Sequence, residues 1–283
     1  MPILRRLFGG GRPVVSLLRL SGPIGMGGRF RPGISYAGMA EQIDAAFAVK
    51  RLKAVALVIN SPGGSPVQSA LILRRIRALA EEKDVPVLAF AEDVAASGGY
   101  MLCLAGDEIF AHEASIVGSI GVIAAGFGFS EAIGRLGIER RLYTAGENKA
   151  RLDSFSPEKQ EDVDWLMGLQ DEIHTYFKSL VRERRGRRLP KEGPDLFNGD
   201  VWLGEKAAEL GLIDAVGDAR HTLRDRFGKK VKIKTVAPKR GLLAGLTGRG
   251  GSDAGLADAG GTGFADQLLA SLEARLMWSR FGL

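Results

Sequence analysis

The chain has 283 residues, a formal net charge of +6 at pH 7, 45% hydrophobic residues and 25% charged residues. Such a composition is typical of a soluble globular protein and favours neither a disordered chain nor a polytopic membrane protein, and the length fits one catalytic domain with appendages. A single cysteine excludes an internal disulfide, and together with three histidines it leaves no zinc-ligand cluster. We therefore expect neither a bound metal nor another cofactor.

The N-terminal part of the chain alternates predicted strands with predicted helices. Continuous apolar runs predict buried strands, while apolar residues at three- and four-residue spacing predict helices. The strands are expected at residues 14–20, 54–59 and 85–91, and the helices at residues 37–49, 67–80 and 97–105. This alternation is typical of crossover units around a mostly parallel sheet, which places the chain in the α/β class.

The middle of the chain continues with shorter elements and then one long helix. Extended segments are expected at residues 109–111, 116–124 and 138–143, and a short helix at residues 129–136. Ser156 followed by Pro157 predicts the N-terminus of a helix that continues to about Arg185. Its apolar residues form one stripe, which predicts packing on the core or contact with another subunit. The stripe consists of Trp165, Leu169, Ile173, Phe177 and Leu180.

Composition divides the chain into four segments. Residues 1–13 are a basic N-terminal segment, residues 14–237 the main folded domain, residues 238–263 a Gly-rich linker, and residues 264–283 an amphipathic helix. Within the main domain, residues 201–214 are predicted as strand, helix and strand. The C-terminal helix could dock on a neighbouring subunit, lie on a membrane or cap its own domain.

The sequence contains no apolar run of bilayer length and no leader pattern. We therefore expect a cytoplasmic protein, with any membrane contact made peripherally at the inner membrane. Basic runs at residues 182–188 and 229–240 are expected to be solvated faces, or else surfaces attracted to anionic lipid. Nucleic acid is not an expected partner, because no aromatic residues are interleaved with these charges.

Ser97 and Lys149 are the candidate nucleophile and base of a peptidase that uses no histidine. Ser97 lies in the small-residue stretch at residues 95–100, which would leave its hydroxyl open. A serine hydroxyl attacks a carbonyl only after losing its proton, and a lysine can take that proton only if burial keeps its amine uncharged. We therefore expect an apolar pocket around Lys149.

A second motif, Asn-Ser-Pro-Gly-Gly-Ser at residues 60–65, links a predicted strand to a predicted helix. Pro62 fixes the turn, while Gly63 and Gly64 allow main-chain amides to approach a ligand closely. Such a turn can be purely structural. Together with the amide of Gly98, however, it offers hydrogen-bond donors to a developing oxyanion.

Four features follow one another along the chain: residues 60–64, Ala-Ser-Gly-Gly-Tyr at residues 96–100, Gly-Ser-Ile-Gly-Val at residues 118–122, and Lys149. In this order and spacing the sequence resembles the signal peptide peptidase A family of serine peptidases, including its SohB-like members. The resemblance covers about residues 14–236.

The resemblance implies a fold of the Clp protease and crotonase type, in which β-β-α units stack into a superhelix with mostly parallel sheets. It implies that Ser97 is the nucleophile, that Lys149 is the general base, and that the hydroxyl of Ser119 holds the lysine amine toward Ser97. The matching oxyanion and substrate-binding positions are Gly63, Gly64 and Gly98. Apolar peptide substrates, such as signal-peptide remnants or membrane-protein segments, and a homo-oligomer are also implied.

Two alternatives stay open. A crotonase-like enzyme would bind an acyl-CoA thioester and take its acid or base from Glu92, Asp93 or Glu113, which leaves Ser97 and Lys149 without a task. A non-catalytic assembly or membrane scaffold would instead use the long helix and the C-terminal segment.

The three histidines are expected to be bystanders. A Clp-type protease needs a histidine on the strand after the nucleophile helix, but residues 116–125 contain none. His112, His174 and His221 therefore need only solvated or packed roles.

Overall fold

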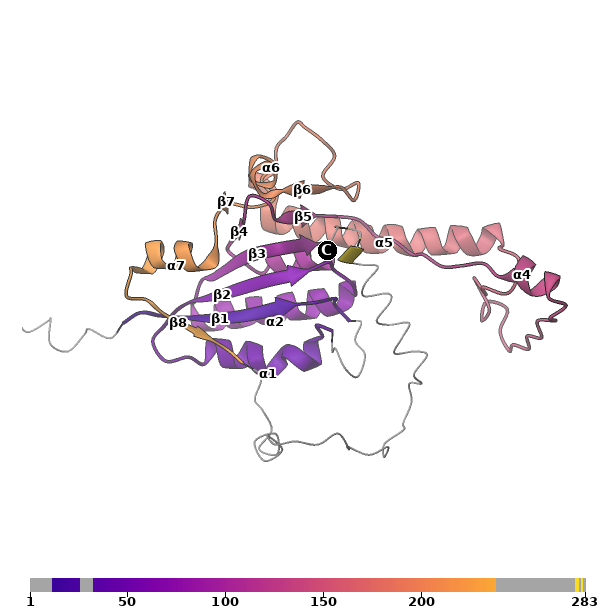
Figure 1. Cartoon of the computed structure of the whole chain (residues 1–283), viewed down its shortest axis with the longest axis horizontal. Helices are drawn as coiled ribbons and strands as arrows, with labels where there is room; N and C mark the ends of the chain where they lie inside the picture. Colours follow the sequence, from indigo (N-terminus) through magenta and orange to yellow (C-terminus); the bar gives the residue numbers. More distant parts are fainter. Residues whose placement is uncertain (1–11, 26–32, 238–277, 280, 282–283) are drawn as a thin grey trace, which may run out of the picture.

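The computed structural model describes residues 12–25, 33–237, 278–279 and 281. Its centre is one twisted, mostly parallel sheet (Figure 1). The main path runs through β6 (Val201–Leu203), β5 (Ile116–Gly118), β3 (Val87–Ala96), β2 (Leu52–Ser61), β1 (Val14–Ser21) and β8 (Lys232–Thr235). β4 (Glu108–Ala111) pairs with β3 and with β7 (Ala215–Val216), and the pair of β5 and β6 is antiparallel. The predicted α/β class is confirmed.

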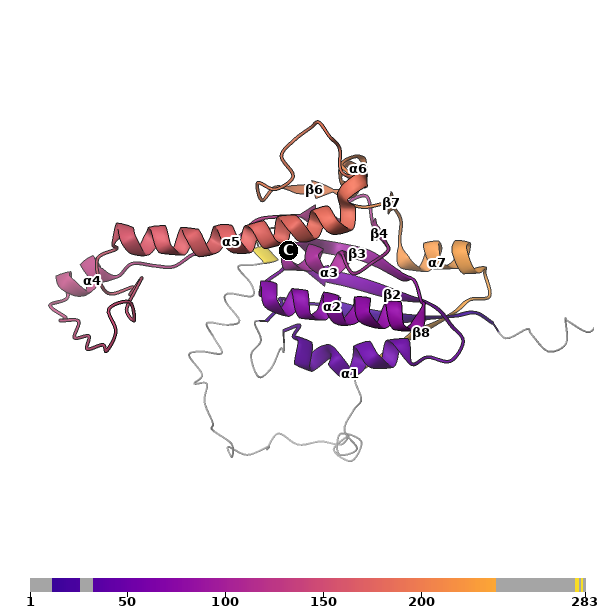
Figure 2. The ribbon, with the colours of Figure 1, turned by 180° about the vertical axis from the view of Figure 1, so that it is seen from behind.

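The central strands are apolar on both faces because both faces are covered. Helices α1 (Tyr36–Phe47), α2 (Pro66–Lys83) and α3 (Gly98–Cys103) lie against one face (Figure 2). Helix α7 (Ala219–Phe227) covers part of the other face, where Leu223 is buried in a cluster with Phe90 and Phe110. The sheet therefore forms the middle layer of three. Ser97, Ser119 and the Gly63-Gly64 turn follow the carboxyl ends of β3, β5 and β2.

Local sequence explains where these helices begin. The hydroxyl of Ser35 accepts a hydrogen bond from the amide of Gly38 at the start of α1. Ser65 caps α2 in the same way, and Pro66 occupies the first turn, where its missing N–H costs nothing. The Pro-Gly-Gly turn thus leads directly into a capped helix, as the sequence predicted.

The second half of the chain differs from expectation in three places. Residues 138–143 form no strand, since they lie where no neighbouring strand is available for pairing. The long helix α5 (Gln160–Arg185) begins later than predicted, because the hydroxyl of Ser156 donates to Asp153 instead of capping it. The predicted last strand is displaced to β7, after a turn at residues 211–214.

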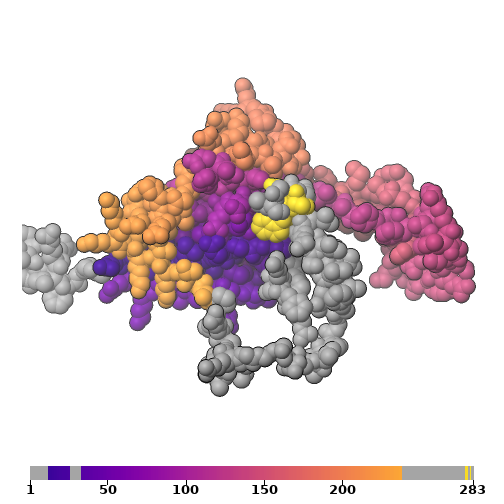
Figure 3. All heavy atoms as spheres, viewed as in Figure 1, coloured from indigo at the N-terminus to yellow at the C-terminus, as the bar shows by residue number. Residues whose placement is uncertain are grey.

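We define the arm as residues 121–173, which contain α4 (Ser130–Arg135) and the first half of α5. The arm projects well beyond the sheet and stands clear of the rest of the molecule (Figures 1 and 3). Large apolar side chains are exposed along it, including Ile123, Phe127, Leu136, Tyr143, Trp165 and Met167. Only the second half of α5 is packed, through Phe177, Leu180 and Val181. The apolar stripe of the long helix therefore packs on the core at its C-terminal end only.

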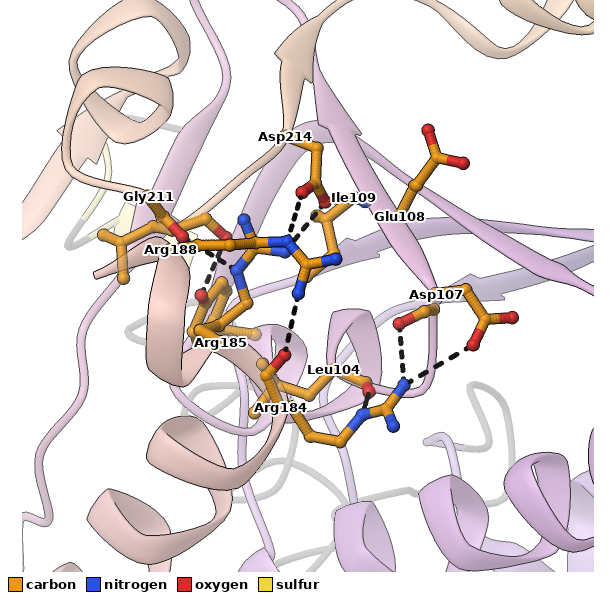
Figure 4. A network of polar contacts seen from close by, with 12 residues as sticks. Leu104, Asp107, Glu108, Ile109, Arg184, Arg185, Arg188, Gly211 and Asp214 are labelled. Atoms are coloured by element: carbon orange, nitrogen blue, oxygen red, sulfur yellow. Dashed lines mark hydrogen bonds and ion pairs between the residues drawn. The ribbon is translucent and has the colours of Figure 1, made fainter.

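The C-terminal end of α5 is fastened to the core by a polar network (Figure 4). Arg184 donates to the carbonyl oxygens of Leu104 at 2.8 Å and Gly106 at 3.0 Å. Arg185, of which 2% is exposed, donates to the carbonyl oxygen of Gly211 and pairs with Asp214, each at 2.8 Å. Part of the basic run at residues 182–188 is thus internal, and not a solvated face as predicted. The 3-10 turn η2 (Gly186–Arg188) and the short helix α6 (Gly204–Glu209) follow.

We expect Arg185→Met to lower the free energy of unfolding by about 3 to 5 kcal/mol, because it removes the buried guanidinium that pairs with the carboxylate of Asp214 and donates to the carbonyl of Gly211. Arg188 pairs with the same carboxylate at 2.8 Å, but its side chain is 48% exposed. Arg188→Met should therefore cost about 1 kcal/mol or less. Urea unfolding of both variants checks this, and equal losses would show that burial does not set the contribution.

Candidate active site

Ser97 lies in a sharp turn between β3 and α3. Its backbone has φ +52° and ψ −121°, a left-handed conformation that costs a non-glycine residue energy and persists only where the surroundings enforce it. One enforcing contact is the hydrogen bond from its amide to the carbonyl oxygen of Gly118 at 2.8 Å. A strained strand-turn-helix serine is the geometry that presents a nucleophilic hydroxyl at the edge of a sheet.

The Gly63-Gly64 turn packs directly against the turn of Ser97. A Cβ atom on Gly63 would lie 2.8 Å from the Cβ of Ser97 and 3.0 Å from the amide nitrogen of Gly98. A Cβ on Gly98 would lie 3.3 Å from the amide nitrogen of Gly64. Within the described part of the chain, the amides of Gly64 and Gly98 have no hydrogen-bond acceptor. Two free donors beside a serine are what stabilisation of an oxyanion requires.

Ser119 is brought next to Ser97 by strand register. Ala96 of β3 pairs with Gly118 of β5, and each serine is the residue that follows its strand. Ser119 also has a positive φ of +53°, and its amide donates to the carbonyl oxygen of Asp200 at 2.7 Å. Residues 201–214 were predicted only as strand, helix and strand, and the role of Asp200 in holding the Ser119 turn was missed. The ring of Trp202 packs against Gly118, and a Cβ atom on Gly118 would lie only 2.8 Å from this ring.

Lys149 lies on the arm and is exposed, so the expected apolar pocket does not surround it in a single chain. Its neighbour Arg151 pairs with Asp162 near the start of α5. Further along the same helix, His174 contacts the carbonyl oxygen of Ile120, the residue after Ser119. His174 follows Asp162 by twelve positions, which is about 18 Å of helix. The structure therefore brings Ser97, Ser119 and the glycines together but leaves Lys149 apart from them.

Cys103 is buried, and the three histidines already have partners. Cys103 is fully buried, and burial raises the pKa of its thiol to about 12, so it stays protonated. Among the described residues, the histidines bind other partners: His112 contacts Glu113 at 3.1 Å, and His221 contacts Asp225 at 3.0 Å.

A hollow of about 830 Å³ lies on the sheet face beside α7, lined by residues such as Leu17, Phe90, Asp93 and Arg224. None of the six predicted site residues lines it. We therefore do not assign it to the reaction centre. A strained serine turn beside two free amides is the arrangement typical of serine peptidase domains.

Comparison with known proteins agrees with this class. Peptidase family S49 matches residues 79–234, more than half of the chain, and the chain belongs to this family. A protease of Synechocystis sp. is 32% identical over 206 residues, which cover 70% of this chain and 73% of that protein. The 1510-N membrane-bound stomatin-specific protease superposes with a TM-score of 0.50 at 16% identity, covering 81% of this chain and 100% of its own. That likeness confirms the fold alone.

A further relative carries a different name. The Na(+)/H(+) antiporter NhaA of Brucella abortus is 50% identical over 284 residues, which cover 99% of this chain but 38% of the antiporter. The chain thus spans well under two thirds of that protein. No helix in the described ranges is long and apolar enough to cross a bilayer.

Proposed function

We propose that this chain is a serine endopeptidase in which Ser97 attacks the peptide carbonyl and Lys149 is the general base. The observation that carries the proposal is the strained turn of Ser97, packed against a glycine turn with two unpartnered amides. A crotonase-like acyl-CoA enzyme also uses such amides, but it has no need of a nucleophile there. Two of the three carboxylates from which it could take its acid or base are already engaged, Glu92 with Arg19 and Asp93 with Asn60.

The reaction follows from these groups. Lys149 takes the proton of the Ser97 hydroxyl, the oxygen bonds to the carbonyl carbon, and the resulting oxyanion accepts hydrogen bonds from Gly64 and Gly98. Collapse of this intermediate expels the amine, which receives the proton from Lys149. Water then attacks the acyl ester with Lys149 again as base, which releases the acid and restores Ser97. Ser119 directs the lysine amine toward Ser97.

In the assembled enzyme, Lys149 reaches Ser97 from another subunit. The supporting observations are its position on the arm and the row of exposed apolar side chains there, which a neighbouring copy would cover. Closing the arm against another subunit would also remove water from around Lys149 and keep its amine uncharged. The site would thus be completed by a homo-oligomer.

Apolar peptides, such as signal-peptide remnants or membrane-protein segments, are the substrates this proposal assigns. The similarity of the chain to part of an antiporter supports work on or beside a membrane. We place the protein in the cytoplasm or peripherally at the inner membrane, with no nucleic acid partner.

Mixing two inactive variants tests both the dyad and the assembly. Ser97→Ala retains Lys149, and Lys149→Ala retains Ser97, so co-expressed chains should recover activity at about a quarter of their sites if the dyad spans two subunits. Hydrolysis of a fluorogenic apolar peptide by the doubly tagged, co-purified complex measures the recovery.

Each variant expressed alone is the control and should stay inactive. A co-purified complex without recovered activity would contradict a base supplied by a neighbouring subunit. Activity in Ser97→Ala alone would contradict the peptidase mechanism itself.

A further inference from the structure

One residue of the Pro-Gly-Gly motif, Asn60, lies where the strand pairing of the sheet changes. Ile59 of β2 pairs with Ala91 of β3, but the next pair joins Ser61 to Ala95. Three residues of β3, 92–94, therefore oppose Asn60 alone. This is a β-bulge, a feature that bends a strand and re-aims the side chains beyond it, often next to active sites.

The bulge is also the point where β3 changes its neighbour on the other side. Before it, residues 88–91 of β3 pair with β4, and after it, residues 94–96 pair with β5. The second pairing brings Ser97 beside Ser119. The bulge thus sets the direction of the end of β3, and it lies where β5 replaces β4 as the neighbouring strand next to Ser97.

The side chain of Asn60 spans this bulge. Its Nδ2 donates to the carboxylate of Asp93 at 2.6 Å, and its Oδ1 accepts the amide of Val94 at 3.2 Å. Its main-chain carbonyl accepts the amide of Gly22, which follows β1, at 2.9 Å. One residue therefore ties together the carboxyl ends of three strands.

Beyond the bulge, the ends of β2 and β3 lead into two turns that are in close contact. The Gly63 turn follows Asn60 by three residues, Ser97 follows Asp93 by four, and the two turns touch with no space for a single added carbon. A small displacement of one strand end relative to the other changes the distance between the Ser97 hydroxyl and the amides of Gly64 and Gly98.

We propose that Asn60 and Asp93 are a positioning pair that fixes the bulge and so aims Ser97 at the two amides. This inference rests on the proposed peptidase function. Neither side chain touches the reacting atoms in this assignment, so their loss should lower kcat with little change in KM.

The test uses the full chain and three variants. Asn60→Asp removes the Nδ2 donor and sets two carboxylates in contact, and kcat for a fluorogenic apolar peptide should fall by about 10²-fold, as for a misplaced reacting group. Asp93→Asn keeps an acceptor for Asn60 and should change kcat little. The double variant Asn60→Asp/Asp93→Asn reverses donor and acceptor and should recover most of the loss.

Arg19→Gln is the matched control, because it breaks the ion pair with Glu92, the residue beside Asp93, without touching the bulge amide. It should keep kcat at the wild-type value. Hydrogen exchange of the Val94 amide supplies a readout independent of activity: fast in Asn60→Asp, slow in the wild type and the double variant.

The outcomes separate the two proposals. If hydrolysis depends on Ser97 but Asn60→Asp keeps full kcat, or the double variant does not recover, the positioning pair is overturned and the peptidase stands. If the wild type shows no Ser97-dependent hydrolysis, the proposed function fails, and hydrogen exchange of the Val94 amide then tests the positioning pair by itself. Unchanged protection of this amide in Asn60→Asp overturns the pair. Loss of protection in Asn60→Asp that the double variant restores supports it.

Discussion

Ser97→Ala is expected to lower kcat for an apolar peptide by at least about 10⁴-fold, because it removes the hydroxyl that would form the acyl intermediate beside the two free amides. Lys149→Ala should cost a similar factor, since a hydroxyl without a base attacks slowly. Steady-state hydrolysis of a fluorogenic peptide library by the wild type and both variants measures the losses.

Both variants should remain folded. The Ser97 side chain forms no hydrogen bond within the described residues, and Lys149 is exposed, so thermal unfolding midpoints close to the wild-type value are the control. Residual hydrolysis near the wild-type rate in either variant would remove that residue from the mechanism. Loss in Ser97→Ala alone would point to a base other than Lys149.

Gly63→Ala is expected to reduce kcat by about 10²-fold or more, through displacement of the oxyanion donors. The added methyl would lie 2.8 Å from the Cβ of Ser97 and 2.9 Å from the carbonyl oxygen of Ala96, so the two turns must separate. Measurement of kcat and KM with the same peptide checks the effect, which should appear mainly in kcat.

Gly22→Ala is a matched control for backbone strain. Gly22 has φ +113° and Gly63 has φ +105°, so both substitutions place alanine in a conformation that favours glycine. Among the described residues, a Cβ at Gly22 meets no atom within 4 Å, whereas one at Gly63 meets the Ser97 turn. If both variants lose the same activity, strain and not the clash with Ser97 is responsible.

Much of the fold could be predicted from hydrophobic patterns. The strand at residues 54–59 and the helix at residues 67–80 were found because one is a continuous apolar run and the other is periodic and capped by Ser65. The strand at residues 85–91 was ended too early. Glu92 and Asp93 interrupt its apolar run, because they lie in the bulge. The hydrophobic pattern of a sequence does not reveal such a bulge.

The site was predictable in part for a similar reason. Glycines beside a serine indicate tight turns, and this signal can be found in a short stretch of sequence. The structure places the residues so indicated together: Gly63, Gly64, Gly98, Ser97 and Ser119. Under the proposed assembly, the position of Lys149 relative to Ser97 depends on what the arm contacts, and local sequence patterns do not specify such a contact. The roles of Asn60 and Asp93 depend on strand register, which residue spacing along one strand does not specify.

The exposed position of Lys149 on the arm has a consequence for control of the enzyme. Under the proposed mechanism, a newly made, solitary chain has Ser97 and the two free amides together, but its general base Lys149 lies apart from them on the arm. Specific activity should then rise steeply with protein concentration and vanish on dilution. Such a peptidase would not cleave surrounding proteins until enough copies had assembled.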